Sequence, residues 1–170
     1  MKNLYFFKYV AILLLLTRSF SCQNMDTQKE VIEPLVPDDE VIAFFEEHLP
    51  TFACATSDCF FVDIDKIDNV CLKINSVDEF RKISSCSSTI LPVIDFNCYT
   101  LIIGQYYATP SSGYSIVGQN LIIEAKKMEL NLIVEIMENG WGLSLLCNLY
   151  YWGIYPKINN EHIIVNVKYQ

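Results

Sequence analysis

The first twenty-two residues constrain most strongly what this chain can fold into, because they have the pattern of an export signal and not of a domain. Their start is basic, residues 10–16 are apolar, and small residues precede Cys22. The apolar stretch is shorter than the run of about 20 residues that crosses a membrane as a helix. Cleavage before Cys22 would leave 149 of the 170 residues, a length that suits one domain.

The segment that ends at Cys22 resembles the lipoprotein signals of bacteria, and in particular those of Bacteroidota. In such signals residues 1–21 would be removed, and the cysteine would carry lipid as the first residue of the mature protein. Ser19 stands where these signals usually have leucine. The resemblance implies a cell-envelope protein that lipid on Cys22 holds to the outer membrane, on either its periplasmic or its surface face.

The charge of the mature chain argues against two classes of partner. Three of the twelve basic residues precede Cys22, so 9 basic and 20 acidic residues remain, with a formal net charge near −11. A phosphate backbone repels such a surface, so we expect no nucleic acid partner. Anionic headgroups repel it as well, which leaves the lipid on Cys22 as the expected contact with the membrane.

An even number of cysteines follows Cys22, as is common in exported chains that form disulfides. Six cysteines allow 15 pairings, so the sequence does not give the connectivity. Free cysteines packed as small apolar residues are the alternative. Neither His48 nor His162 has a neighbour at a ligand spacing, so no metal site is predicted. The candidates for disulfides are Cys54, Cys59, Cys71, Cys86, Cys98 and Cys147.

The N-terminal part of the mature chain predicts a tether followed by helices. Residues 22–37 are polar and acidic, contain two prolines and show no sustained period, so they are expected to form an acidic tether. Residues 38–49 begin with acidic side chains and repeat apolar ones at helical spacing, which predicts a helix that Pro50 ends. Ser76 followed by Glu79 has the form of a capping box and predicts a second, short helix.

The rest of the chain is expected to be rich in strands, because apolar and β-branched residues alternate or cluster there. Residues 60–65 and 70–74 are predicted to be strands on either side of a turn. The predicted fold class is α+β, with a single domain over residues 38–170, mainly antiparallel sheet and one or two short N-terminal helices. The other candidate strands are 98–103, 113–116, 120–125, 131–137, 143–152 (or a buried helix) and 163–169.

No sequence pattern has the residue types and spacing of a catalytic centre. Asp63, Asp65, Asp68 and Asn69 are close together, but the glycine and glutamate of an EF-hand loop are missing. Residues 113–118 lack the glycine spacing of a nucleophile elbow, and no Walker or dinucleotide glycine pattern occurs. We therefore expect no enzyme activity and no cofactor.

The segment after Tyr106-Tyr107 is the predicted binding loop. Proline, serine and glycine rarely fill a core, and small residues allow a partner to approach the backbone closely. Aromatic residues are common anchors of protein interfaces, although those of residues 150–155 are more simply explained as core residues of strands. The predicted partner-binding loop consists of Thr109, Pro110, Ser111, Ser112, Gly113 and Tyr114.

Three short motifs resemble the C-terminal domain of the PrcB family of protease-complex lipoproteins. That family typically has an Asp-Phe pair before a strand, a glycine at the end of the strand, and a Gly-Tyr-Ser-Ile-type segment that opens the next strand. Here these are Asp95-Phe96, Gly104 and residues 113–116, within a similar region over residues 91–170. The resemblance implies a small β-rich module that associates with an extracytoplasmic protease and is not itself catalytic.

A second resemblance implies a different activity. Residues 109–114 are similar to the Asn-Pro-Thr-Thr-Gly-Tyr loop of chagasin-type cysteine-protease inhibitors, with Thr109 in place of asparagine. Residues 140–142 and Tyr155-Pro156 stand in the places of the second and third inhibitory loops. Such inhibitors wedge rigid loops into the cleft of a protease.

The sequence thus predicts a lipid-anchored envelope protein with a non-catalytic function. The first expectation is a protein-binding or protease-accessory module that presents residues 108–114 to a protein partner. A protease inhibitor is the first alternative, and a structural envelope lipoprotein without a specific activity is the second.

Overall fold

The computed structural model describes residues 29–51, 57–86, 91–108, 114–124, 127–136, 147–159 and 162–170. Strands make up most of the regular structure in these residues, and the α+β class predicted from the sequence is confirmed. The elements are β1 (Lys29–Ile32), α2 (Asp39–His48), β2 (Val70–Ile74), α3 (Val77–Ile83), β3 (Tyr99–Ala108), β4 (Tyr114–Glu124), β5 (Lys127–Ile136), β6 (Cys147–Pro156) and β7 (Ile164–Tyr169).

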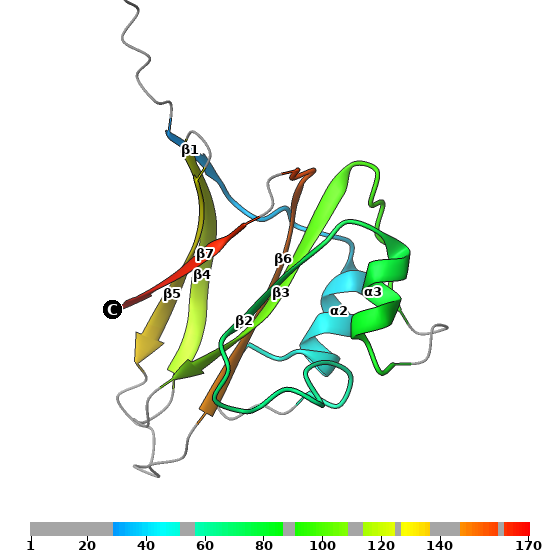
Figure 1. Cartoon of the computed structure of the whole chain (residues 1–170), viewed down its shortest axis with the longest axis horizontal. Coiled ribbons are helices and arrows are strands. Elements are labelled where there is room, and N and C mark those ends of the chain that lie inside the picture. The colour runs from blue at the N-terminus through cyan, green and yellow to red at the C-terminus, as the bar shows by residue number, and fades with distance from the viewer. Residues whose placement is uncertain are drawn as a thin grey trace, which may run out of the picture.

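The strands form two sheets that face each other, and α2 and α3 cover the outer face of one of them (Figure 1). The sheet away from the helices has the order β1-β4-β5-β7, and the sheet between it and the helices has the order β2-β3-β6. The β5–β7 pair is parallel, whereas β1–β4, β4–β5, β2–β3 and β3–β6 are antiparallel. The molecule therefore has three layers.

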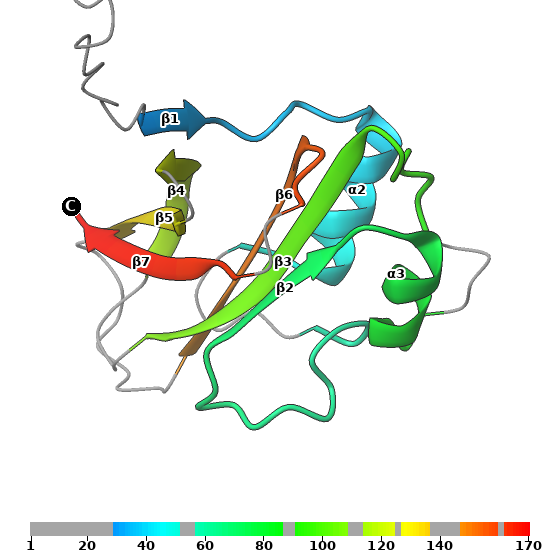
Figure 2. The same cartoon turned by 45° about the horizontal axis from the view of Figure 1, so that its top comes forward.

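The middle sheet is buried on both faces, which explains the uninterrupted apolar run at the centre of β3. Leu101 and Ile103 belong to the cluster that includes the helices, whereas Ile102 belongs to the cluster between the two sheets. Successive side chains of a strand point to opposite faces, so three apolar residues in a row are needed to fill both layers. Figure 2 shows β3 between the helices and β7.

Helix α2 confirms the predicted helix and supplies aromatic residues to the outer core. Its first turn carries Asp39 and Glu40, and the helix ends with the N–H of Leu49 donating to the carbonyl of Phe45 at 2.8 Å. Acidic side chains stabilise the positive end of a helix dipole. Phe45 is fully buried and stacks on Trp152 of β6, with ring centroids 4.4 Å apart.

Helix α3 begins at the predicted cap. The hydroxyl of Ser76 accepts a hydrogen bond from the N–H of Glu79 at 3.2 Å, and the Glu79 carboxylate accepts one from the N–H of Asn75 at 2.7 Å. Ser76 thus satisfies a backbone donor of the first helical turn, and Glu79 satisfies one that directly precedes the helix. Phe80 is the buried residue by which this helix packs on the core.

The predicted strand over residues 70–74 is confirmed as β2, but the predicted strand over residues 60–65, and with it the hairpin, is wrong. Phe60 makes only an isolated bridge to Ser84, Phe61 has a φ of 61°, and turns follow. The apolar pair looked like a strand because Phe60 is a core residue and Phe61 stacks on Tyr150. β2 pairs with β3 instead.

Regular structure begins earlier than the predicted domain boundary at residue 38. Residues 29–32, inside the segment predicted as a tether, form β1 and pair antiparallel with residues 121–124 of β4. Leu35 then makes an isolated bridge to Ile154 of β6. The segment passes from the edge of one sheet to the edge of the other, as Figure 2 shows for β1 and the chain that leads to α2.

Other strand predictions also change in their bounds, and β3 and β5 are longer than the predicted strands 98–103 and 131–137. Residues 113–116 and 120–125 were predicted as separate strands, but β4 is continuous from Tyr114 to Glu124 with a bulge between Ile116 and Gly118. For residues 143–152 the described part is a strand and not a buried helix, because β6 begins at Cys147 and pairs with β3.

Candidate functional site

A groove with a volume of about 660 Å³ lies between the edges of the two sheets. One wall is the bulged part of β4 and the other is β6, while the segment after β1 and the end of α2 form the remaining sides. Most of its lining is apolar. The lining residues are Glu33, Pro34, Leu35, Pro37, Glu46, Leu49, Pro50, Thr51, Ile116, Val117, Gly118, Gln119, Tyr151, Trp152 and Gly153.

Both strands that wall the groove have an edge that no other described strand pairs. β1 covers only residues 121–124 of β4, so the part of β4 from Tyr114 to Asn120 has β5 as its one strand partner in the described chain. β6 is the outermost described strand of its sheet. An open sheet edge presents backbone donors and acceptors that a further strand can use.

Two interactions already occupy part of the β6 edge. The N–H of Leu35 donates to the carbonyl of Ile154 at 2.7 Å, and the side-chain amide of Gln119 donates to the carbonyl of Trp152. A Cβ on Gly153 would lie 2.5 Å from the Gln119 amide nitrogen and 3.3 Å from Pro34. The absence of a side chain at Gly153 therefore lets β4 and the Pro34 segment approach β6.

The bulge in β4 determines which side chain reaches the groove mouth. At a bulge one extra residue is left out of the pairing, and the strand bends there. Val117 is that residue, and its side chain is 48% exposed. On the opposite wall, Trp152 is half-buried and is held by its stacking on Phe45.

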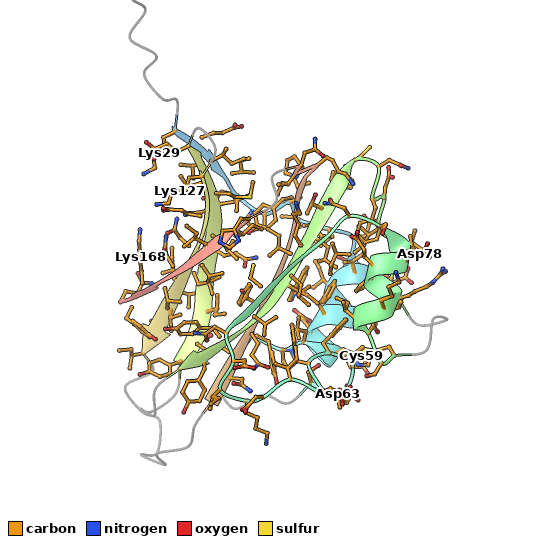
Figure 3. The ribbon with its side chains drawn as sticks, in the orientation of Figure 1. Lys29, Cys59, Asp63, Asp78, Lys127 and Lys168 are labelled. Atoms are coloured by element: carbon orange, nitrogen blue, oxygen red, sulfur yellow. A yellow bond between two sulfur atoms is a disulfide. The ribbon has the colours of Figure 1, made fainter. Side chains whose placement is uncertain are left out.

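The charge at the groove is negative. Glu33 and Glu46 lie in its lining, and the described lining residues include no lysine, arginine or histidine. Three basic side chains lie on the sheet away from the helices, where Figure 3 shows Lys29 of β1, Lys127 of β5 and Lys168 of β7. Lys127 is paired there with Glu129 at 2.5 Å.

A second cleft, of about 550 Å³, lies at the opposite edges of the two sheets, between β2 and β7. Cys71, Tyr151 and His162 are among its lining residues. Burial raises the pKa of the Cys71 thiol, and burial also raises the pKa of Tyr151, whose hydroxyl donates to the carbonyl of Val70 at 2.9 Å. A thiol that stays protonated is a weak nucleophile.

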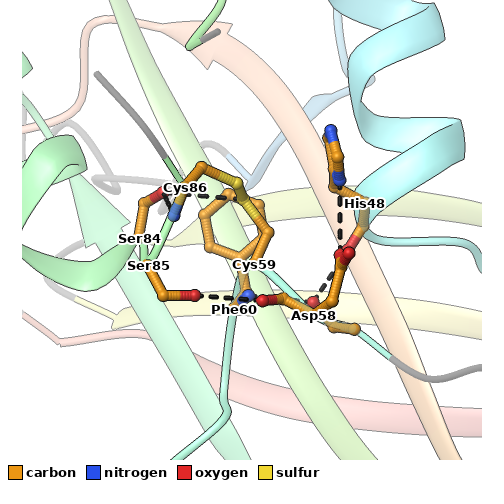
Figure 4. Close-up of a disulfide and its surroundings, with 8 residues drawn as sticks. His48, Asp58, Cys59, Phe60, Ser84, Ser85 and Cys86 are labelled. Carbon is orange, nitrogen blue, oxygen red and sulfur yellow. Dashed lines mark hydrogen bonds and ion pairs between the residues drawn. A yellow bond between two sulfur atoms is a disulfide. The ribbon is translucent and has the colours of Figure 1, made fainter. Parts of the chain in front are cut away.

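Two of the cysteines predicted as disulfide candidates are bonded to each other, and two are free. Cys59 and Cys86 form a disulfide with Cα atoms 5.0 Å apart (Figure 4). Cys71 is a free, half-buried cysteine, and Cys98 is a free, exposed one. The side chains of Cys54 and Cys147, like the whole of Cys22, lie outside the described residues.

The structure describes only the last residue of the predicted partner-binding loop. Residues 109–113 lie outside the described residues. Tyr114 is only 6% exposed and packs against Tyr169, with ring centroids 5.6 Å apart, so its side chain offers a partner little surface. It begins β4, within the predicted strand 113–116, and faces the core.

Some motifs of the two resemblances lie at other positions in the fold than the resemblances imply. Residues 114–116 open β4 as expected, but Gly104 lies within β3 and not at its end. Tyr155 is buried and Pro156 pairs with Tyr99 at the end of β6, so neither belongs to an inhibitory loop.

Sequence reasoning missed the groove and one cluster of potential ligands. The groove walls come from strands far apart in the chain, and no local pattern joins them. His48, Cys59 and Cys86 are likewise brought together from a helix end and two loops. The hydrogen bond of 3.3 Å between His48 Nδ1 and Asp58 Oδ1 lies beside them.

Comparison with known proteins finds no family model, no curated protein and no solved structure that matches this chain. Within the part of the chain that the structure describes, no helix has the length and apolar character to cross a membrane.

Proposed function

We propose that this chain is an exported, lipid-anchored protein of the cell envelope that binds an extended segment of a protein partner in the groove between β4 and β6. The observation that carries the proposal is the open edge of β6 beside an apolar groove. The site is a binding site and not a catalytic one. The lipid on Cys22 concentrates it at a membrane.

The backbone of β6 supports the addition of a strand. Along a strand, the N–H and C=O groups of alternate residues point to the same side. The carbonyls of Trp152 and Ile154 accept bonds from outside the sheet, so the backbone groups of Tyr150 point outward as well. Leu35 forms one antiparallel bridge to Ile154, and a longer guest strand would form a row of such backbone contacts along β6. This mode of binding is called β-strand addition.

The chemistry of the groove specifies the partner segment. Val117, Leu35 and Trp152 offer apolar contact to alternate side chains of an extended chain. Glu33 and Glu46 in the lining favour lysine or arginine in the segment, and the formal net charge near −11 of the mature chain adds a long-range attraction for a basic partner. The partner is therefore an extended, apolar segment with basic residues. The PrcB resemblance favours an extracytoplasmic protease as its owner.

Site-specific photo-crosslinking in intact cells tests the proposal. A photoreactive residue at Val117, in the full-length chain, is expected to capture a protein partner. The same residue at Val93 is expected to capture none, because Val93 is 90% exposed but does not line the groove. Equal capture from both positions, or none from Val117, contradicts the groove as the binding site.

A matched pair of charge reversals tests the partner chemistry. Glu46 and Glu47 are neighbouring exposed residues of α2, but only Glu46 lines the groove. Glu46→Lys is expected to reduce the capture from Val117 several-fold, about 1 kcal/mol of lost attraction, whereas Glu47→Lys should leave the capture unchanged. A larger effect of Glu47→Lys than of Glu46→Lys contradicts the assignment of a basic segment.

A further inference from the structure

The imidazole of His48 lies beside the Cys59–Cys86 disulfide (Figure 4). One ligand atom of each of these three residues lies within 4.8 Å of the other two. One imidazole nitrogen and two thiolates are a donor set that Zn²⁺ prefers. We propose that reduction of the disulfide turns this cluster into a zinc site, with His48, Cys59 and Cys86 as the protein ligands.

The two cysteines are held together by contacts other than their disulfide. The N–H of Ser85 donates to the carbonyl of Cys59 at 2.9 Å, and the Ser85 hydroxyl donates to the carbonyl of Asp58 at 3.0 Å. Phe60 and Ser84 form a β-bridge in the same place. Because these bonds do not involve sulfur, the two thiols stay close together after reduction.

The histidine is tied to the same frame. The hydroxyl of Ser57 donates to the carbonyl of His48 at 2.8 Å and accepts from the N–H of Phe60 at 2.9 Å. The ring of His48 packs on Phe44, with centroids 4.8 Å apart, and its side chain is 15% exposed. The end of α2 and the loop that carries Cys59 therefore keep their relative positions in both redox states.

The surroundings favour a cation. Asp58 places a carboxylate oxygen 3.3 Å from Nδ1 of His48. A carboxylate on a metal-binding histidine orients the ring and raises its basicity. His48 also lies in the last turn of α2, where the helix dipole is negative.

A dithiol reductant supplies the electrons and protons that convert the Cys59–Cys86 disulfide into two thiols. The dithiol closes to its own disulfide and gives two electrons and two protons, so that the Cys59–Cys86 bond breaks and two thiols form. Zinc then displaces both thiol protons and binds two thiolates and one imidazole nitrogen, with the fourth position open to water. The disulfide and the metal thus exclude each other.

Cobalt titration of the full-length protein tests the site, because Co²⁺ in a thiolate site absorbs strongly whereas Zn²⁺ is silent. The dithiol-reduced protein, freed of excess dithiol under anaerobic conditions, is expected to develop thiolate-to-cobalt charge-transfer bands with one Co²⁺ per chain. Zn²⁺ should abolish them by displacement. The oxidised protein should show no such bands.

Variants separate this cluster from the other thiols and histidines. His48→Asn is expected to weaken Co²⁺ binding by about tenfold or more, whereas His162→Asn, at an exposed histidine, should leave it unchanged. Asp58→Asn alters a side chain that is 85% exposed and should weaken binding by about tenfold without a loss of folding. Cys98→Ser should keep the charge-transfer bands, and Cys59→Ser should lose most of their intensity. Far-UV circular dichroism checks that each variant folds.

The proposal is overturned if the reduced wild-type protein shows no charge-transfer bands, or if folded His48→Asn and Asp58→Asn both bind Co²⁺ with wild-type affinity. Loss of the bands in Cys98→Ser but not in Cys59→Ser also overturns it. None of these measurements depends on a partner in the groove.

Discussion

Gly104 shows how one residue without a side chain can organise the contact between two strands. A Cβ at this position would overlap the phenol ring of Tyr151 and the carbonyl oxygen of Val70. The ring of Tyr151 crosses β3 at Gly104, so that its hydroxyl reaches the Val70 carbonyl on β2. The glycine is therefore required for the hydrogen bond of a buried tyrosine.

Gly104→Ala is expected to lower the free energy of unfolding by about 3 kcal/mol, because the methyl group displaces the Tyr151 ring and breaks a buried hydrogen bond. Urea denaturation followed by tryptophan fluorescence measures the change. Gly118→Ala is the matched control, since its Cβ would meet Ile133 at an ordinary 3.4 Å, and its effect should stay within about 0.5 kcal/mol. Equal stabilities of the two variants would contradict this role of Gly104.

At the scale of single residues, the sequence indicated that disulfides form but not which cysteines pair. The even number of cysteines indicated disulfides, and one exists between Cys59 and Cys86, but nothing local selected that pair from the 15 pairings. No metal site was expected, because His48 and the two cysteines have no short motif spacing. Tyr114 was predicted both in the loop and in a strand, and its burial depends on packing against Tyr169, which no local pattern shows.

At the scale of elements, local signals were sufficient for both described helices. The acidic first turn of α2 and the Ser76–Glu79 cap of α3 act on neighbouring backbone groups, so a short stretch of sequence is enough to predict where each helix begins. Strands depend on residues far along the chain. β1 is four residues long and pairs with residues 121–124, so no period could reveal it. Phe60 and Phe61 lacked such a partner strand and formed none.

Ser76→Ala is expected to lower the free energy of unfolding by about 1 kcal/mol, because the N–H of Glu79 loses its acceptor at the start of α3. Ser76→Asp should recover most of the loss, since aspartate is an equally good cap. Chemical denaturation of the three proteins gives the comparison. If the aspartate variant is as unstable as the alanine variant, the hydroxyl has some other role than capping.

At the scale of the whole molecule, the sequence could predict the class but not the layers. An apolar run such as residues 101–103 fits a strand between two layers, yet the pattern does not say which elements form them. β5 pairs in parallel with β7, although β6 lies between them in the sequence and belongs to the other sheet. This pairing depends on how the two sheets pack. The groove arises from the same packing, so no local sequence pattern could reveal it.

The proposed lipid anchor would act on the whole molecule, and the location of the protein in the cell tests it. Cys22→Ser is expected to move the protein from the membrane fraction to the soluble fraction, because one cysteine would carry the acyl chains. Mass spectrometry of the mature amino terminus should find Cys22 with added lipid. Cys98→Ser, at an exposed cysteine, should leave both results unchanged. An unmodified mature terminus at another residue contradicts the anchor.

With lipid on Cys22, the position of β1 would limit how far the domain can stand from a bilayer. Only residues 23–28 separate Cys22 from Lys29, the first residue of the sheet. Seven residue steps span at most roughly 25 Å, even when fully extended. The groove wall at residues 33–37 follows directly after β1, so a lipid on Cys22 would keep the groove close to the headgroups. A guest chain would then have to emerge from the same membrane or lie flat along it, and a partner that diffuses freely in the periplasm would meet the groove far less often.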